Sequence, residues 1–532
     1  MSSVETPDDG PPKPPPGSLR EAYRAWRHFF WLLGVIIAVA LFYAEENWRG
    51  PHAWEKYAQA RAAKGDVLKA SAFVPPVVLE EENFVAAPAV SPLFRMGRQA
   101  HAPRFDAASA ALKTGKTELS NSWVKARTDF VGWYVAFAQP TNQNRHEVLR
   151  TVEVATNVSV RVAASNVLAG LSEADPVFEK LREASRRPYS RFDLPYLQDD
   201  PAAILLPHLA ALKHLCQVLQ LRASAEVALG QTDKAAEDIG LMLYLANACR
   251  SEPILISQLV RIAQVHLAFQ PIAEGMNQWS DAQLRSFQEQ LGGFDFCADM
   301  HRALGAERVL FGGGMIEYVR RSPDKIQILN NIQSNGSNLQ GEIAGALLNF
   351  APSGWLDLEK LNYMRTYGDY LLPIIDVQGH QVSPTVARRA EQRINGLVHH
   401  TAPELVLRHG FFCALMVPSI SSAARRTAFA QAAIEQAIVA CALQRYRLAH
   451  GAYPDSLESL APQFIAKLPH DLINGQPLKY RRSEDGQYVL YSVGWNETDD
   501  DGRVAVIKSG EVIARNGSVE LEQGDWVWRP LD

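Results

Sequence analysis

The sequence contains no catalytic or nucleotide-binding motif. It has no GxSxG, no HExxH, no Walker A loop, no GxGxxG after a predicted strand and no zinc-ligand spacing. Its histidines group as His399-His400 with His409 and as His208 with His214, and neither group has i,i+4 ligand spacing on a helix. The sequence therefore predicts no particular reaction, although carboxylates that converge only in the folded chain would leave no such pattern.

Cysteine is scarce, and its spacing gives no metal pattern and no disulfide framework. None of the five cysteines belongs to a CxxC pair, and their odd number leaves at least one thiol unpaired. Most lie in apolar, helix-like contexts, where a free cysteine behaves as a small hydrophobe. One or two disulfides stay open as an alternative in an oxidising compartment. The cysteines are Cys216, Cys249, Cys297, Cys413 and Cys441.

The chain also lacks a long basic run. Its net charge is −5 at pH 7 and its pI is near 6.3, so nucleic acid is not an expected partner, because neutralising phosphates needs clustered Lys and Arg. A small basic patch at Arg186–Arg191 is interpreted as a positively charged helix C-terminus, with acidic lipid or polysaccharide as the alternative ligand. The composition, 47% hydrophobic and 21% charged, is that of a globular protein, and 532 residues leave room for two or three domains.

One uncharged apolar run, Phe29 to Ala44, differs from this average composition. As a helix it would cover roughly 24 Å, a little short of the ~30 Å hydrocarbon core of a bilayer, and Ala25 and Trp26 extend it. Arginines precede the run and glutamates follow it, so the positive-inside bias places the N-terminus in the cytoplasm. The sequence predicts a single-pass anchor in the inner (cytoplasmic) membrane, with the bulk of the chain outside. The flanking charges are Arg20, Arg24, Arg27, Glu45 and Glu46.

Two alternatives compete with the anchor. A cleaved signal peptide would use the small-x-small site Ala38-Val39-Ala40, but the bulky residues Leu41, Phe42 and Tyr43 continue beyond it. A buried core helix is disfavoured by the asymmetry of the flanking charges. The anchor is the favoured interpretation.

The chain is predicted to be mainly α-helical, and changes in its residue pattern divide it into five parts. A Pro-rich tail is expected to be disordered, and the segment after the anchor is expected to form a short helix from Pro51 to Lys64 and an extended stretch lying on the next domain. A helical domain and a small α+β domain follow. The parts are residues 1–19 (tail), 20–48 (anchor), 49–97 (juxtamembrane helix and linker), 98–420 (helical domain) and 421–532 (α+β domain).

The helical domain is predicted from apolar residues at 3.6-residue spacing. Ser280 and Gln283 form a capping box that starts one of its helices. Leu221–Gly230, followed by Lys234–Asp238, resembles half of a tetratricopeptide-type helical pair, although no period of about 34 residues recurs. The domain is therefore interpreted as an irregular array of helical hairpins. Between Gly312 and Ser353 the pattern loosens, which predicts a mobile excursion. The expected helices span residues 146–170, 205–230, 232–248 and 254–276.

The last hundred residues have a distinct order of elements. A long Ala-rich helix from Arg425 to Ala449 ends at Gly451, and a Tyr453-Pro454 turn follows. Asp455 is expected to cap a short helix at 456–460. Asn474-Gly475 predicts a tight turn, and the stretch 487–493 alternates as a strand does. Further short strands are expected at residues 504–507, 511–514 and 525–528.

This order resembles the C-terminal module of the type II secretion major pseudopilins. The wording Gly-x-Tyr-Pro, Asp-x-x-x-Gly-x-Pro-Leu and Leu-Tyr-Ser-Val-Gly falls in the expected sequence. The chain departs from that family in two ways, because the apolar segment lies far upstream without a prepilin cleavage site and a large helical domain intervenes. The resemblance implies a calcium-binding loop near the last strands, at Glu497, Asp499, Asp500 and Asp501. Clustered carboxylates suit a hard cation, and a solvated acidic turn is the alternative.

These features predict a membrane-tethered envelope protein that serves binding or scaffolding without catalysis and has a protein partner in the envelope. One alternative is an envelope hydrolase or polysaccharide-active enzyme with an unrecognised site. Another is an accessory component of a type II secretion-like system. Two or more carboxylates with raised pKa values converging in a deep pocket would favour the enzyme, and a groove without them would favour the binding protein.

Overall fold

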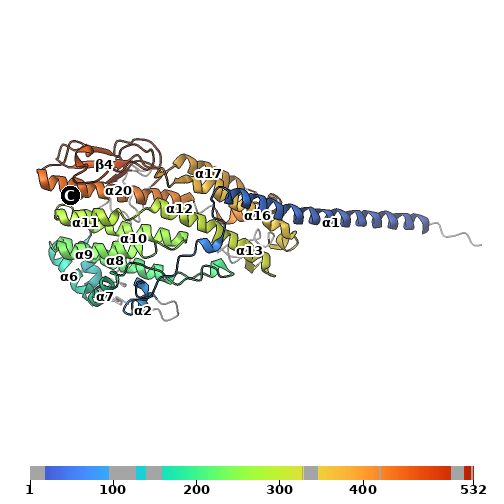
Figure 1. Cartoon of the computed structure of the whole chain (residues 1–532), viewed down its shortest axis with the longest axis horizontal. Coiled ribbons are helices and arrows are strands. Elements are labelled where there is room, and N and C mark those ends of the chain that lie inside the picture. The colour runs from blue at the N-terminus through green and yellow to red at the C-terminus, as the bar shows by residue number, and fades with distance from the viewer. Residues whose placement is uncertain are drawn as a thin grey trace, which may run out of the picture.

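The computed structural model describes residues 18–94, 127–138, 158–325, 327–328, 345–398, 400–417, 421–504, 521–528 and 531. The described part is mainly helical, with a long apolar helix at the N-terminal end and a few strands near the C-terminus. In Figure 1 helix α1 projects from one end of a body of packed helices, and the strands lie against α20. The predicted fold class is confirmed at this level.

The helices differ widely in length, and the strands are short. In chain order the α-helices are α1 (Ser18–Ala62), α2 (Ser91–Phe94), α4 (Phe130–Ala138), α6 (Val160–Leu171), α7 (Asp175–Ala184), α8 (Pro207–Ala228), α9 (Thr232–Asn247), α10 (Leu255–Glu274), α11 (Asp281–Leu291), α12 (Phe296–Ala306), α13 (Gly314–Arg321), α16 (Ser353–Thr366), α17 (Pro384–Val398), α18 (Ala402–Leu407), α19 (Phe411–Met416) and α20 (Ser421–His450). The strands are β1 (Ile375–Asp376), β2 (Gln381–Val382), β3 (Lys479–Arg482), β4 (Tyr488–Ser492) and β5 (Trp526–Trp528).

Two π-helical turns and six 3-10 turns complete the regular structure. The π-helical turns are Glu307–Gly313 and Tyr367–Leu371. The 3-10 turns are Ala70–Ala72, Phe84–Ala86, Ser172–Ala174, Pro201–Ala203, Leu372–Ile374 and Leu457–Leu460. All of these turns belong to the described part of the chain.

The central helices form antiparallel hairpins, as their apolar spacing predicts. Helix α8 ends where Gly230 takes a φ of 77°, and α9 starts two residues later. The two helices pack side by side, and α10 packs against both. Ala223 and Ala225 are fully buried, so small side chains allow this close approach. The capping box of Ser280 at the start of α11 is also confirmed.

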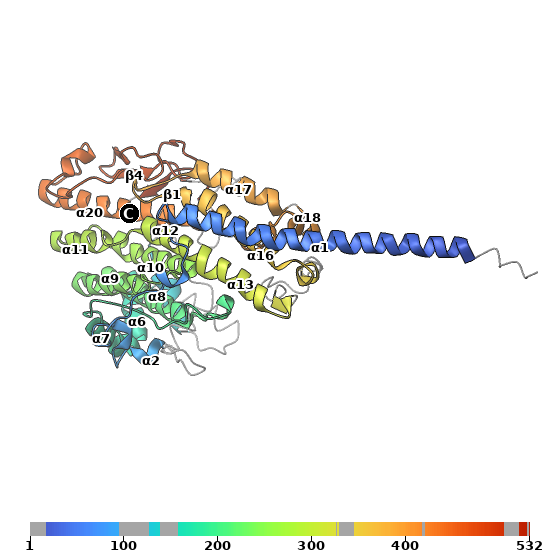
Figure 2. The same ribbon diagram turned by 45° about the vertical axis from the view of Figure 1, so that its right-hand side comes forward.

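Helix α1 is continuous from the apolar segment into the body, so the prediction of a separate short helix beginning at Pro51 is wrong. Pro51 lies inside the helix. A proline inside a helix removes one backbone hydrogen bond, but the helix is held here by packing along α16. The predicted stop is confirmed, because α1 ends at Ala62 and Gly65 takes a φ of 78°. The apolar segment and the segment that packs on the body therefore share one helix (Figure 2).

Two glycines allow α1 and α16 to cross in close contact. A Cβ on Gly50 would overlap the backbone of Gly354, and a Cβ on Gly354 would overlap the backbone of Glu46. Asn47 reinforces the crossing, because its Oδ1 accepts a hydrogen bond from the Gly354 N–H at 3.0 Å and from the Ser353 hydroxyl at 3.1 Å. The side chain of one helix thus caps the N-terminus of the other, where backbone donors lack partners.

The extended stretch after α1 lies on the body, as predicted, and the basic patch holds it there. The backbone N–H of Phe84 donates to the Tyr189 carbonyl at 2.8 Å, and the Phe84 side chain is fully buried. Arg187 donates to the carbonyl oxygens of Glu80 and Asn83 at 2.8 and 2.9 Å. Arg187 therefore binds the chain's own backbone, a role that neither interpretation of the patch included.

The glycine run at 312–314 is helical, so the expected excursion does not begin there. Gly312 and Gly313 close a π-helical turn and Gly314 begins α13. A Cβ on Gly312 would overlap the ring of Tyr363 on α16. These glycines serve close helix packing, which glycine alone allows, and do not act as a hinge. The sequence Asn335-Gly336-Ser337 lies outside the described residues.

The C-terminal elements pack onto the same core as the hairpins. Helix α20 contacts α10, α11 and α12, and its other side carries the sheet β3–β4–β5. Gly451 ends α20 with a φ of 80°, and Gly475 turns the chain with a φ of 70°, as predicted. The expected Asp455 cap is wrong, because Ser456 precedes the 3-10 turn and Asp455 pairs with Arg482 at 2.7 Å. Residues 511–514 lie outside the described part.

Asp471 joins the 471–476 turn to β4. Its carboxylate accepts hydrogen bonds from the backbone N–H groups of Ile473 and Val493, at 3.0 and 2.9 Å, and from the Ser492 hydroxyl at 2.9 Å. The side chain is almost fully buried. Three donors therefore depend on one carboxylate that water cannot replace.

Replacing Asp471 by alanine is expected to lower the free energy of unfolding by about 3 kcal/mol, because buried donors left without acceptors are costly. Urea unfolding of the full chain in neutral detergent would measure the loss. Asp485→Ala is the control, since Asp485 is exposed and accepts one hydrogen bond from the backbone of Gln487. Equal stability of the two variants would contradict the role given to Asp471.

Candidate binding pocket

A pocket of about 1030 Å³ lies between α11, α20, the β1–β2 turn and residues 462–475. Its central charged groups already pair with each other or with neighbours. His380 Nε2 lies 2.7 Å from Glu435 Oε1, and this hydrogen bond raises the pKa of His380. Arg445 donates to Asp281 at 2.7 Å and to Gln288 at 2.9 Å. These pairs join the walls of the pocket.

A second pocket, of about 590 Å³, lies between α16, the π-helical turn 367–371, α17 and the turn that joins α18 to α19. Three arginines from three elements line it: Arg365 on α16, Arg393 on α17 and Arg408 after α18. We call it the arginine pocket. Its volume is in the range that small-molecule sites occupy, roughly 300–1,000 Å³.

Neighbouring groups position these arginines without neutralising them. The Arg365 guanidinium carbon lies 5.7 Å from the ring centroid of Tyr57, and that of Arg393 lies 5.8 Å from the ring of Tyr370. Asn362 donates to the carbonyl oxygen of Arg408 at 3.3 Å and so holds the turn that carries it. Stacking on an aromatic face orients a guanidinium while its N–H groups stay free to bind.

The arginine pocket has an excess of positive charge. Asp369 is the only carboxylate among its lining residues, and it already bonds Arg61 at 2.6 Å. None of the three arginines forms an ion pair with a carboxylate in the part of the chain that the structure describes. His400 also lines the pocket, with its Nδ1 3.6 Å from Glu404. Guanidinium groups bind carboxylate and phosphate oxygens through paired N–H donors, so an anion fits this arrangement.

The acidic loop predicted to bind calcium has a different partner at each carboxylate. Glu497 pairs with Arg388 on α17, and Asp499 lies 3.1 Å from Lys479 Nζ. Asp500 accepts a hydrogen bond from the Asn496 amide at 2.8 Å, and Asp501 forms a long ion pair with Arg481 at 3.9 Å. Among the described residues these four do not form a group of three ligand atoms within 4.8 Å of one another. The calcium site stays a prediction.

The acidic loop is anchored by a residue that the sequence did not single out. Asp525 is almost fully buried, and its carboxylate accepts the backbone N–H of Asp500 at 3.2 Å and of Gly502 at 2.6 Å. Burial raises the pKa of Asp525, while these two hydrogen bonds oppose the shift. The loop is thus fixed by its backbone, and its side chains point to separate partners.

The described histidines of the two sequence groups have separate interaction partners. His409 Nε2 accepts a hydrogen bond from the Trp355 indole N–H at 3.1 Å, and burial lowers the pKa of His409 to about 4. His400 lines the arginine pocket, and His399 lies outside the described residues. His208 is almost fully buried, and His214 has an interaction partner of its own.

Known proteins offer no template for this arrangement. No protein-family model matches the chain, and no curated protein or solved structure matches it either. The resemblance of the C-terminal region to the pseudopilin module therefore stays a prediction. The function has to be argued from the geometry of the described residues.

Proposed function

We propose that the chain is a single-pass membrane protein that binds an anionic ligand in the arginine pocket outside the membrane. The observation that carries this proposal is the convergence of Arg365, Arg393 and Arg408 on one pocket without carboxylate partners. Three neighbouring cations repel one another, and an anion carrying phosphate or carboxylate groups removes that repulsion.

The membrane part of the proposal rests on the exposed apolar half of α1. Trp31 and Leu41 are 72% and 65% exposed, and the most apolar window of the helix buries nothing against the body. Such a surface is unstable in water and stable in lipid. By length and composition α8 could also cross a membrane, but its side chains belong to the protein core. Tyr43 contacts the Phe350 carbonyl where α1 meets the body, which suits an aromatic residue at the membrane interface.

An N-terminal tag tests the anchor. The tag is expected to stay on the mature protein, because an anchor is not cleaved. The protein is also expected to stay in the membrane fraction after alkaline carbonate extraction, because an inserted helix resists extraction. A protease added to intact spheroplasts should digest the body and spare the tag. Loss of the tag during export would contradict the anchor and support a signal peptide.

The pocket favours binding over catalysis. Its single carboxylate is ion-paired with Arg61, so two converging acids, as a hydrolase of glycosidic bonds uses, are missing from the described lining. In the 1030 Å³ pocket Asp471 has a pKa raised by burial, but its carboxylate is taken up by three protein donors. By the criterion set from the sequence, these pockets support a binding protein.

Charge removal tests the ligand. Isothermal titration of the full chain in neutral detergent with inorganic pyrophosphate and with citrate is expected to show binding that weakens as salt rises. Arg393→Gln should reduce the affinity roughly tenfold or more, since it removes a charge-assisted contact. Arg389→Gln is the matched control, because Arg389 is exposed on the same helix and does not line the pocket. Equal affinity of the two variants, or no binding of either anion, would contradict the proposal.

We also propose that the chain is a scaffold with a pseudopilin-like tail. The order of α20, the Tyr-Pro turn and the strands supports a pseudopilin-like α+β tail, and the α8–α9 hairpin supports a distant likeness to tetratricopeptide pairs. Both suit a scaffold in the cell envelope with a protein partner. Crosslinking in native membranes followed by pull-down would identify that partner, and recovery of a secretion platform would favour the accessory role.

A further inference from the structure

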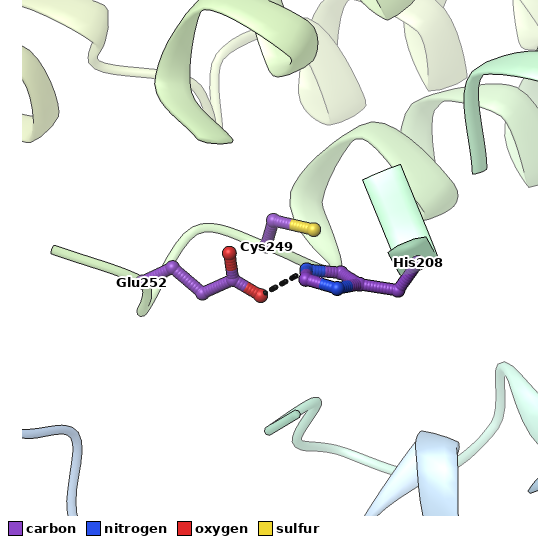
Figure 3. A group of neighbouring side chains, drawn as sticks. All are labelled: His208, Cys249 and Glu252. Carbon is purple, nitrogen blue, oxygen red and sulfur yellow. Dashed lines mark hydrogen bonds and ion pairs between the residues drawn. The ribbon is translucent and has the colours of Figure 1, made fainter. Parts of the chain in front are cut away.

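Three residues with metal-binding side chains meet in the core, away from the arginine pocket. His208 is the second residue of α8, and Cys249 and Glu252 lie in the turn between α9 and α10. One ligand atom from each lies within 4.8 Å of the other two, and all three residues are almost fully buried. Figure 3 shows the imidazole and the carboxylate edge to edge, with the thiol beside them.

The surrounding groups fix the orientation of this trio. His208 Nε2 lies 2.8 Å from Glu252 Oε1, and the Phe192 ring stacks on the imidazole at 4.1 Å between centroids. The Ser257 hydroxyl donates to the second oxygen of Glu252, and the Gln258 amide donates to the Glu252 backbone carbonyl at 2.7 Å. Metal ligands in proteins are commonly held by such outer hydrogen bonds.

The charges around the trio leave room for a cation. Arg261 is the neighbouring cation, and it is committed to Asp299 at 2.9 Å and to Asn247 at 2.8 Å. A carboxylate and a thiol are thus buried together, and the His208 Nδ1 has no hydrogen-bond partner among the described residues. The Tyr196 hydroxyl is also buried without a hydrogen-bond partner among the described residues, and burial and the charges of Glu252 and Cys249 raise its pKa. Burying acidic groups is costly unless a positive charge compensates them. His208 can supply that charge to Glu252 only when it is protonated, and since a metal-binding histidine is neutral, the cation would take over this role.

We propose that His208, Cys249 and Glu252 bind one divalent cation of the zinc class. The donor set of imidazole nitrogen, thiolate sulfur and carboxylate oxygen is borderline-soft, which suits Zn²⁺ and disfavours Ca²⁺ and Mg²⁺. Zinc ligands lie about 2.0–2.3 Å from the ion, so two ligands of a tetrahedral site are roughly 3.3–3.8 Å apart. Binding would therefore separate His208 Nε2 and Glu252 Oε1, now 2.8 Å apart, and bring together any pair that lies near the 4.8 Å limit. The Cys249 thiol releases its proton to solvent when it binds.

The ion would join the start of α8 to the α9–α10 turn and so act as a structural site. Its burial excludes a substrate, and its residues belong to two separate stretches of the central hairpins. Metal binding to the folded state alone raises stability. The site is independent of the arginine pocket, because the two share no residue.

Cobalt(II) is the probe, because a bound thiolate gives it a charge-transfer absorption in the near ultraviolet. Full chain in neutral detergent, stripped with a chelator, is expected to take up one equivalent of Co²⁺ with this absorption and to lose it when Zn²⁺ is added. Zn²⁺ should also raise the melting temperature. Cys249→Ala should abolish the absorption, and Cys441→Ala should keep it, since Cys441 is a buried thiol on α20.

A second variant keeps the test valid if Cys249→Ala fails to fold. Glu252→Gln preserves size and can still accept from Ser257, yet it should weaken Co²⁺ binding roughly tenfold or more, because an amide is a poor ligand. Absence of the thiolate absorption in the wild-type chain would overturn the proposal. So would full retention of that absorption in Cys249→Ala, because the thiolate would then come from another cysteine.

Discussion

Gly354→Leu is expected to separate the anchor helix from the body. The glycine lies where α1 and α16 cross, and any side chain there meets the backbone of Glu46 and Asn47. Rotation of a side chain cannot relieve a backbone contact, so the helices must move apart. Overpacking of this kind costs about 3 kcal/mol or more. The free energy of unfolding of the full chain in detergent would fall by that amount, and trypsin would cut faster near Arg61.

Gly34→Leu is the matched control for this prediction. Gly34 lies in the apolar half of the same helix, and a Cβ there has no atom of the described chain within 4 Å. Stability and trypsin cleavage should both stay at the wild-type level in this variant. If Gly354→Leu behaved in the same way, the close crossing of α1 and α16 would be wrong.

The second large effect is a loss of stability as pH rises from about 5 to about 8. Glu359 is fully buried, and burial raises the pKa of its carboxyl group to about 8, although backbone N–H groups of Phe411 and Phe412 partly oppose the shift. Between pH 4.5 and 8 the folded chain keeps a proton that the unfolded chain has released. The unfolded state binds fewer protons, so stability falls with pH, by up to about 1.4 kcal/mol per pH unit.

Glu359→Gln isolates this contribution. The amide cannot ionise, and like a protonated carboxyl group it keeps one carbonyl oxygen as an acceptor; the two backbone donors reach different oxygens of the native side chain, each at 3.2 Å. Urea unfolding at several pH values should therefore give a flatter stability profile between pH 5 and 8 than the wild type. Glu289→Gln, at an exposed position on α11, should leave the profile unchanged. An identical slope in the wild type and Glu359→Gln would contradict the raised pKa.

The sequence predicted the elements that depend on local pattern. The hairpin helices, the Ser280 cap and the glycine ends of α8 and α20 follow from apolar spacing and backbone conformation, which neighbouring residues determine. The errors occur where tertiary packing outweighs local preference. Pro51 normally ends or starts a helix, and the glycine run at 312–314 normally marks a loop, yet contacts with α16 keep both helical.

The candidate sites could not be predicted, because their residues converge only in the fold. Arg365, Arg393 and Arg408 lie on separate helices and turns, and each alone is typical of a helix surface. The buried trio has one local feature, the spacing Cys249-x-x-Glu252, which is too common to be diagnostic. The acidic loop was conspicuous in the sequence, yet its carboxylates each meet a different partner. Local clustering of charge does not determine where side chains point.

Because α1 is unbroken, its length sets the distance between the proposed membrane-spanning segment and the arginine pocket. Ala44 ends the apolar run, and Tyr57, over which Arg365 stacks, lies thirteen residues further along the same helix. If the apolar run spans a bilayer as proposed and α1 lies along the bilayer normal, then at 1.5 Å per residue Tyr57 and the arginine beside it stand about 20 Å above the hydrocarbon edge. That height lies beyond the headgroup layer of simple phospholipids, about 5–8 Å deep on each side. Under the proposed anchoring, the anion that we propose for this pocket would be free in solution or carried on a long chain extending from the surface.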